Sequence, residues 1–283
     1  MSGHFSIWIV TPAGYLHSRA FEEVSLSLRA AFRTLGFDAP IVTDPAQVKD
    51  YAIVLGANLL PHIPRESLPA KLILYNLEQV QQDSPWLKQE YVGLLRRYPV
   101  WDYSARNIAN LKQHFGVTNV TLCGIGYMPE LSCIAPAAED IDVAFIGSLN
   151  PRRKAVLEKI AAAGKQVTAG YNLYGKERDA LIARSKLVLN LHFYDAQIFE
   201  IVRVSYLLAN RKCVVSETGN DPALEDPLRL GIAFSPYENL ADTCLIMLAQ
   251  SDGRVAIAQK GFELFSAMSQ VPMLKRALAC LPL

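Results

Sequence analysis

The chain alternates short apolar runs with longer segments whose apolar residues recur at helical spacing. Residues 4–10 contain a nearly continuous apolar run, which is typical of a strand buried on both faces of a parallel sheet. In the next segment Phe21, Val24 and Leu28 stand three and four residues apart, and Gly36 follows as a natural helix end. Strands that alternate with helices imply parallel sheets with right-handed crossovers. The pattern therefore predicts an α/β fold.

The alternation stops over residues 123–140, a stretch rich in Pro and Ala, and then starts again. We therefore predict two Rossmann-like αβα domains facing a cleft: residues 1–125, a linker at 126–140, and residues 141–283, whose last helix could pack on the first domain. Further strands are expected near 40–43, 51–55, 71–75, 99–102, 119–122, 142–146, 165–169, 186–191, 212–216 and 231–234. Further helices are expected near 86–97, 104–115, 151–163, 176–185, 197–210, 238–249, 254–268 and 272–280.

Composition excludes several classes of protein. Hydrophobic residues make up 51% of the 283 residues and charged residues 19%, which excludes a disordered chain. The net charge of +1 indicates no nucleic-acid partner and no anionic membrane. Five cysteines without a Cys-x-x-Cys pair indicate neither a disulfide framework nor a zinc site. No apolar stretch approaches the roughly 20 residues of a transmembrane segment. We expect a soluble cytoplasmic protein.

In sheets of this kind ligands bind beyond the carboxyl ends of the strands, so functional residues are expected in the loops at that edge. His17 follows the first strand and stands just before a helix. Histidine is a residue type suited to general-base catalysis, and a surface or capping histidine is the alternative. The polar residues 76–79 follow another strand, where they would either bind a ligand or form a polar turn.

The loop that restarts the pattern in the second half contains Gly147, Ser148, Asn150, Arg152 and Arg153. It has a glycine turn, a proline at the helix start and two cations. Backbone N–H groups at a helix start attract anions, and arginine donates to phosphate oxygens. These features predict a diphosphate site, and a solvated helix face is the alternative. The P-loop and dinucleotide fingerprints are absent from the sequence.

A second cluster consists of Asn190, His192, Glu200, Arg203 and Glu217. Asn190 and His192 are expected at one strand end and Glu217 at the next, with Glu200 and Arg203 one helical turn apart. These residues are predicted to line one ligand pocket. A structural Glu200–Arg203 ion pair is the alternative. His192, Asp195 and Glu200 match no metal-ligand spacing, so no metal is predicted.

The residues of these clusters stand in a known order. Phe-Ile-Gly-Ser-Leu-Asn-x-Arg-Arg begins at Phe145, Tyr-Gly-x-Glu-Arg-Asp at Tyr174, Ser-Lys-Leu-Val-Leu-Asn-Leu-His at Ser185, Phe-Glu-x-x-Arg at Phe199 and Val-Val-Ser-Glu at Val214. This order resembles the donor-binding domain of GT-B fold glycosyltransferases, closest to bacterial spore-maturation-type families. The resemblance covers residues 140–235.

The resemblance implies that the second domain holds a nucleotide sugar, UDP- or GDP-linked, and that the first domain holds the acceptor. It implies catalysis without an obligatory metal or other cofactor. Carried over, Glu200 lies near the donor sugar or ribose, Arg152 or Arg153 faces the diphosphate, and His17 stands where many inverting members place their base. The second acidic residue of many retaining members is absent near Tyr206, which leaves the stereochemistry open.

The sequence thus predicts a metal-independent glycosyltransferase that moves a sugar from a nucleotide sugar to an acceptor hydroxyl, with His17 and Glu200 as catalytic residues. The predicted donor-binding residues are Gly147, Ser148, Asn150, Arg152, Arg153, Asn190, His192, Glu200, Arg203 and Glu217. The alternatives are a non-catalytic nucleotide- or glycan-binding protein of the same fold and a sugar-nucleotide epimerase. Turnover of the donor separates the enzyme from the binding protein, and an epimerase would interconvert the donor sugar without an acceptor.

Overall fold

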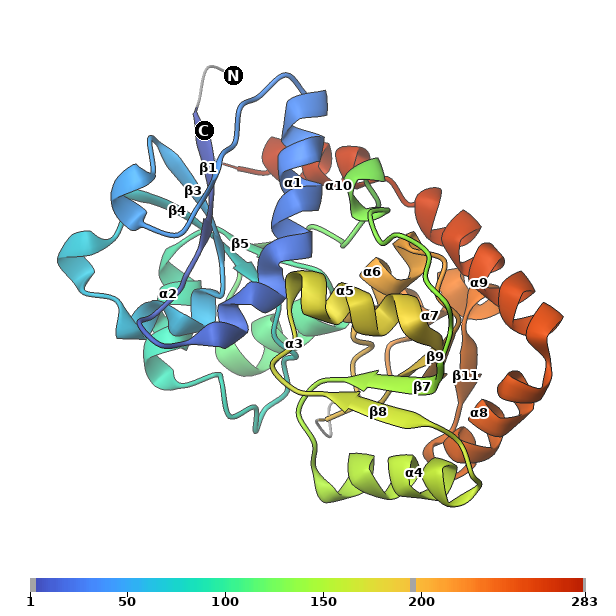
Figure 1. Ribbon diagram of the computed structural model, residues 1–283. Helices are drawn as coiled ribbons and strands as arrows, with labels where there is room; N and C mark the ends of the chain where they lie inside the picture. Colours follow the sequence, from blue (N-terminus) through green and yellow to red (C-terminus); the bar gives the residue numbers. More distant parts are fainter. Residues whose placement is uncertain (1–3, 194–196, 282–283) are drawn as a thin grey trace. The chain divides into compact units, whose positions relative to one another are not determined.

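The computed structural model describes residues 4–193 and 197–281 and consists of two compact units (Figure 1). Unit 1 takes in the chain up to Glu130 together with the segment that starts at Ser269, and unit 2 takes in Leu131–Met268. Each unit has its own parallel sheet with helices packed on it. The architecture is that of two Rossmann-like αβα units, as the alternation predicts.

The sheet of unit 1 has the strand order β2-β1-β3-β4-β5-β6, and every neighbouring pair is parallel. Its strands are β1 (Phe5–Ile9), β2 (Ile41–Val42), β3 (Tyr51–Leu55), β4 (Lys71–Asn76), β5 (Val100–Asp102) and β6 (Val120–Leu122). Its α-helices are α1 (Glu22–Thr34), α2 (Gln89–Arg97), α3 (Ala105–Phe115) and α10 (Gln270–Ala279). All five residues of β1 are buried, as expected for a strand covered on both faces.

The last helix, α10, lies beside α1 within unit 1 (Figure 1). The Gln270 side chain accepts a hydrogen bond from the Gly126 N–H at 2.7 Å and donates to the Gly124 carbonyl at 3.1 Å. A Cβ on Gly124 would lie 3.1 Å from the sulfur of Met273. The chain end is therefore held to the segment that follows β6.

The sheet of unit 2 has the order β11-β10-β9-β7-β8 and is also parallel throughout. Its strands are β7 (Ile141–Ile146), β8 (Val167–Gly170), β9 (Ser185–Asn190), β10 (Val214–Glu217) and β11 (Ala233–Ser235). Its α-helices are α4 (Pro151–Ala162), α5 (Gly175–Arg184), α6 (Ile201–Ala209), α7 (Pro222–Glu225), α8 (Leu240–Ala249) and α9 (Ser251–Ser266).

Alternation along the strands divides the residues of unit 2 between the two faces of its sheet. Leu187 and Leu189 of β9 join a buried cluster with Leu157 of α4 and Leu240 of α8. Asn190, one residue after Leu189, therefore points to the opposite face, where α6 packs on β10. The pleat thus directs a polar side chain toward the helix that carries Arg203.

The predicted elements are present, and their bounds differ from the prediction at a few ends. α6 begins at Ile201, whereas the sequence predicts a helix from 197, because Gln197 has a positive φ of 47° and cannot continue a helix. The prediction also lacks the short 3-10 helices Leu16–Phe21 and Ala57–His62, which follow β1 and β3. Each of these segments has six residues, which is too short to show a helical repeat of apolar positions.

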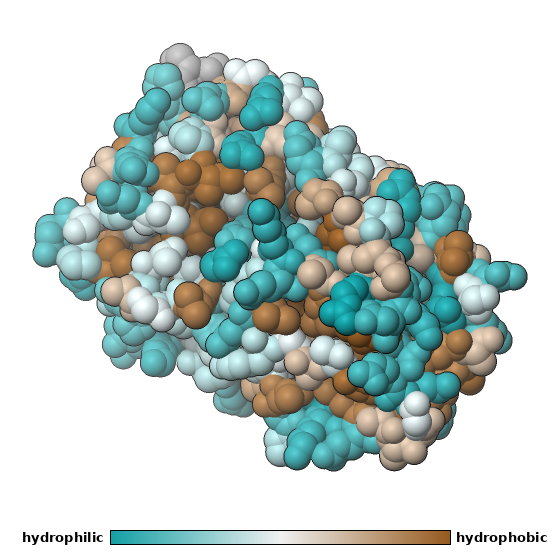
Figure 2. All heavy atoms as spheres, in the orientation of Figure 1, coloured by the Kyte–Doolittle hydropathy of each residue, from teal (hydrophilic) through white to brown (hydrophobic). Residues whose placement is uncertain are grey.

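The surface mixes hydrophilic and apolar side chains, and Figure 2 shows both kinds interspersed on one face. Exposed apolar side chains are ordinary on folded proteins. Within the described residues, no helix combines the length and the apolar character that crossing a bilayer requires.

Candidate functional site

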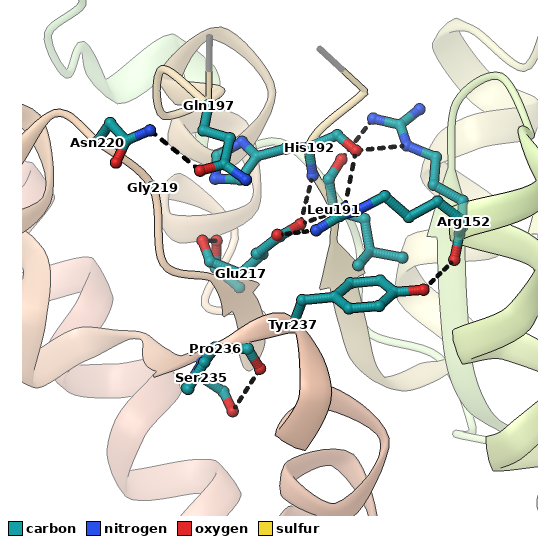
Figure 3. Close-up of polar contacts among 12 residues, drawn as sticks. Arg152, Leu191, His192, Gln197, Glu217, Gly219, Asn220, Ser235, Pro236 and Tyr237 are labelled. Atoms are coloured by element: carbon teal, nitrogen blue, oxygen red, sulfur yellow. Dashed lines mark hydrogen bonds and ion pairs between the residues drawn. The ribbon is translucent and has the colours of Figure 1, made fainter. Parts of the chain in front are cut away.

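Polar side chains meet at the carboxyl ends of three neighbouring strands of unit 2. β9 lies between β7 and β10 in the sheet. β7 ends at Ile146, β9 at Asn190 and β10 at Glu217. Because all three strands are parallel, the loops that follow them lie at one edge of the sheet. Figure 3 shows Arg152, His192 and Glu217 at this edge, with Tyr237 beside them.

The loop after β7 turns sharply into α4. Gly147 has a φ of 145°, a backbone conformation that L side chains rarely adopt. Ser148 is exposed, and Asn150 caps α4 by accepting a hydrogen bond from the Arg153 N–H at 2.8 Å. Pro151 occupies the first helical position, where the absent N–H costs nothing. The sequence therefore fixes both the turn and the helix start.

Arg153 is buried, with only 2% of its surface exposed. Its guanidinium donates to the carbonyls of Ser148 at 2.7 Å, of His192 at 3.4 Å and of Leu191. It therefore ties the loop after β7 to the end of β9. The sequence-based expectation that Arg153 faces a diphosphate does not match this position, because the third residue of α4 points back into the protein and not out of it.

Arg152 forms a two-point ion pair with Glu217. Nη1 donates to Oε2 at 2.7 Å, and Nη2 donates to Oε1 (Figure 3). The guanidinium lies 3.9 Å from the ring centroid of Tyr237, whose hydroxyl donates to the Arg152 carbonyl at 2.9 Å. The hydrogen bond to Glu217 raises the pKa of Arg152, although partial burial opposes it. Glu217 also accepts the His192 N–H at 3.1 Å, so its charge holds two loops together.

Glu200 lies immediately before α6 and pairs with His192. Nδ1 of His192 lies 3.0 Å from Oε2 of Glu200, and Asn190 donates to the same carboxylate at 3.0 Å. Burial raises the pKa of Glu200, but the His192 hydrogen bond and the charges of His192 and Arg203 prevail and lower it. His192, and not Arg203, is therefore the main partner of this carboxylate, which differs from the structural Glu200–Arg203 pair that the sequence left open as an alternative.

Burial lowers the pKa of His192, yet its net shift is upward. The hydrogen bond to Glu200 and the negative charges of Glu200, Glu217 and Glu225 outweigh the loss of solvation. The other ring nitrogen, Nε2, is buried and has no hydrogen-bond partner within the described residues. The arrangement favours an imidazolium whose Nδ1–H donates to Glu200.

Gly219 closes the site from the side of β10, and sequence analysis did not single it out. A Cβ at this position would lie 2.3 Å from the Gln197 carbonyl oxygen and 2.8 Å from His192 Nε2. The neighbouring Asn220 donates to the Gln197 side chain at 3.0 Å (Figure 3). Gly219 stands two residues after Glu217, the last residue of β10. This position, close behind a strand end, is the sequence signal that could have identified the glycine.

Arg203 differs from the other two arginines of the site. It donates to Oδ1 of Asn190 at 3.1 Å, its only hydrogen bond to a described residue, and it is neither fully buried nor fully exposed. Its Nη2 lies 3.6 Å from the point that a Cβ on Gly147 would occupy. Arg203 therefore places a cation beside the glycine of the loop after β7, and within the part of the chain that the structure describes its other guanidinium donors form no hydrogen bond.

The structure brings together every predicted donor-site residue, from Gly147 to Glu217, at one edge of unit 2. His17 belongs to unit 1, where its ring packs against that of Tyr15 at a centroid distance of 5.2 Å. Asp195 lies outside the described residues. Among the described residues, no three His, Cys, Asp or Glu side chains are grouped so as to hold a metal ion.

No family model matches the chain. Two proteins of Acanthamoeba polyphaga mimivirus, both described as uncharacterized, are similar to it. L140 is 29% identical over 203 residues, which are 66% of this chain and 63% of that protein, and R358 is 27% identical over 216 residues, which are 73% and 71%. The match thus spans less than two thirds of L140.

Solved structures of glycosyltransferases share the fold of the whole chain. HepE of Anabaena, crystallised with UDP and glucose, has a TM-score of 0.64 at 14% identity, covering 98% of this chain and all of that one. A glycosyltransferase of Rickettsia africae has a TM-score of 0.58 at 11% identity, covering 98% and 97%. The fold of this chain is therefore that of GT-B glycosyltransferases.

Proposed function

We propose that this protein transfers a sugar from a UDP- or GDP-linked donor to an acceptor hydroxyl and that unit 2 holds the donor. The observation that carries the proposal is the position of Arg203 beside the Gly147 loop, at the edge of the sheet where ligands of such folds bind. The GT-B fold and the nucleotide bound to HepE support the same function.

The site offers different groups to the two ends of a nucleotide sugar. Arg203 has donors for diphosphate oxygens, and Gly147 has no side chain to hinder their approach to the backbone. Glu200, kept ionised by its neighbours, would accept hydrogen bonds from ribose or sugar hydroxyls. Arg152 pairs with Glu217, and Arg153 donates to backbone carbonyls. We assign these three residues the positioning of the loops that follow β7 and β9.

The chemistry requires stabilisation of a leaving nucleoside diphosphate. A guanidinium that donates to the diphosphate oxygens stabilises the negative charge that develops on them as the bond to the sugar breaks. In this proposal Arg203 supplies that charge, so an added divalent metal is not obligatory. The acceptor hydroxyl attacks the anomeric carbon, and its proton passes to a base.

Release of nucleoside diphosphate from a panel of UDP- and GDP-sugars, measured in the presence of EDTA, tests the proposal. We expect one donor to be turned over, and Arg203→Gln to lower the rate at least about tenfold, since a charged hydrogen bond is worth about 1.5–3 kcal/mol. Arg65→Gln, at an exposed arginine of unit 1, serves as the matched control.

Three results would contradict the proposal in different ways. Binding without turnover would favour the non-catalytic protein, and conversion of the donor sugar without acceptor would favour the epimerase. Restoration of turnover by a divalent metal after EDTA would contradict metal independence alone.

A further inference from the structure

Three exposed apolar side chains stand at the carboxyl edge of the sheet in unit 2, the edge that carries the candidate site. They follow three neighbouring strands: Leu149 comes after β7, Tyr171 after β8 and Phe193 after β9. Tyr171 is the most exposed of the three, at 56%. Large apolar side chains exposed together at the edge where such a sheet binds ligands indicate an interaction surface.

Tyr171 stands directly beside the glycine loop after β7. Ile146 of β7 is paired with Gly170 of β8, and the ladder continues one step further, where the Gly147 N–H donates to the Gly170 carbonyl at 3.0 Å. Neighbouring strands lie about 4.8 Å apart. The main chain of Tyr171 therefore begins one strand spacing from the loop that Arg203 approaches.

The turn that carries Tyr171 is held by packing on α5. Asn172 has a positive φ of 56°, a conformation that asparagine adopts more readily than most residues. A Cβ on Gly170 would lie 2.7 Å from Cδ1 of Leu173 and 2.9 Å from Cδ2 of Leu181, so Leu173 folds closely against the end of β8. The chain thus presents an exposed aromatic residue on a turn of fixed shape.

The groups along this edge follow the order of the parts of a nucleotide sugar. β7 lies between β9 and β8, and Gly147 with Arg203 marks the central position. On the β9 side, Asn190 donates to the carboxylate of Glu200. On the β8 side stands Tyr171. Since the diphosphate joins the sugar to the nucleoside, a diphosphate in the centre directs its two ends toward β9 and β8.

We propose that Tyr171 stacks on the nucleobase of the donor, an inference that rests on the proposed function and leaves the sugar hydroxyls to Glu200. A carboxylate accepts hydrogen bonds from hydroxyls, whereas an aromatic ring offers a surface for a planar base. Stacking accepts purines and pyrimidines alike. Tyr171 therefore contributes affinity for the nucleoside and does not select between UDP and GDP.

Phe193 offers a second aromatic ring at this edge and is the competing platform. The Arg153 guanidinium lies 5.0 Å from the centroid of the Phe193 ring, and this ring is less exposed than that of Tyr171. Phe193 also follows β9, the strand whose last residue donates to Glu200. A base on Phe193 would lie on the same side as the sugar, and we therefore assign the base to Tyr171.

Calorimetric titration of uridine, guanosine, UDP, GDP and inorganic pyrophosphate tests the inference. The proteins are wild type, Tyr171→Ala, Tyr171→Phe, Phe193→Ala and the control Ile246→Ala, whose residue in α8 is exposed to the same degree, at 57%. We expect Tyr171→Ala to weaken the bound nucleoside and its diphosphate by the same factor, about 5- to 150-fold, and to leave pyrophosphate unchanged. Tyr171→Phe keeps the ring and should bind like wild type.

A fluorescence measurement tests the stacking itself. Tyr171→Trp keeps an aromatic surface and adds an indole whose emission falls when a base stacks on it. We expect this variant to bind the nucleoside and to show quenching beyond that of wild type. Pyrophosphate, which has no base, should not produce this quenching.

The outcomes separate the inference from the proposed function. Unchanged nucleoside affinity in Tyr171→Ala, no added quenching in Tyr171→Trp, or a larger loss in Phe193→Ala would overturn the role of Tyr171 while leaving the diphosphate site of Arg203 intact. An equal loss for pyrophosphate in Tyr171→Ala would show a structural effect and would also overturn it. Failure of wild type to bind any nucleoside diphosphate would contradict both proposals.

Discussion

At the scale of single residues, sequence spacing does not reveal which charged side chains of unit 2 pair with each other. Spacing allowed, as an alternative, a structural pair between Glu200 and Arg203, one helical turn apart, but Glu200 lies before α6 and pairs with His192 instead. Arg152 and Arg153 are adjacent in sequence, yet one pairs with Glu217 and the other is buried among carbonyls. Residue types were predictable here, but partners depend on loop conformation.

The His192–Glu200 pair makes a prediction about stability and pH. The pKa of His192 is raised from 6.5, so its contribution is present below pH 6.5 and is lost as pH rises through the folded-state pKa. The pKa of Glu200 is lowered from 4.5, so its contribution is present above pH 4.5 and is lost as pH falls through the folded-state pKa. Both contributions are therefore present together between these two values.

Replacing Glu200 by Gln removes the charge and keeps the acceptor for Asn190. We expect the free energy of unfolding to fall by about 1–3 kcal/mol at about pH 5.5 and by less at about pH 9. Urea denaturation of wild type and Glu200→Gln at both pH values measures this, with the exposed Glu66→Gln as control. An equal difference at both pH values would show that the charge of His192 plays no part.

At the scale of elements, apolar periodicity predicted the strands and helices because these depend on local repeats. The 3-10 helices and the non-helical segment just before α6 were not predictable, since they depend on single glycines, prolines and residues of positive φ. The close approach of the 3-10 helix Asp226–Gly231 to α9 is another such feature. A Cβ on Gly261 of α9 would lie 2.6 Å from the Gly231 carbonyl oxygen.

The space around two helical glycines predicts opposite effects of their replacement by alanine. Gly261→Ala should destabilise the protein by about 1–3 kcal/mol, because the methyl group meets backbone that cannot move easily. Gly93→Ala in α2 meets nothing within 4 Å and should stabilise it by up to about 1 kcal/mol. Chemical denaturation of both variants measures the difference. A stabilised Gly261→Ala would contradict the described packing.

At the scale of the whole molecule, each unit carries polar residues at the carboxyl edge of its own parallel sheet. The sequence predicted the two-unit fold and the grouping of polar residues at one sheet edge of unit 2, because strand ends can be located from the apolar runs. It pointed to the polar residues 76–79 but not to the contacts of Glu78, which come in part from Asn58 and Asn107, far from it in the chain. Such a combination forms only when the sheet has formed.

The central claim is that unit 2 binds a nucleoside diphosphate through Arg203. Calorimetric titration of UDP, GDP, uridine and guanosine into wild type, Arg203→Gln and the control Arg65→Gln tests it most directly. We predict that one diphosphate binds wild type more tightly than its nucleoside does. Arg203→Gln should weaken that diphosphate about tenfold to a hundredfold and leave the nucleoside unchanged. Equal losses for both, or no binding of either diphosphate by wild type, would contradict the claim.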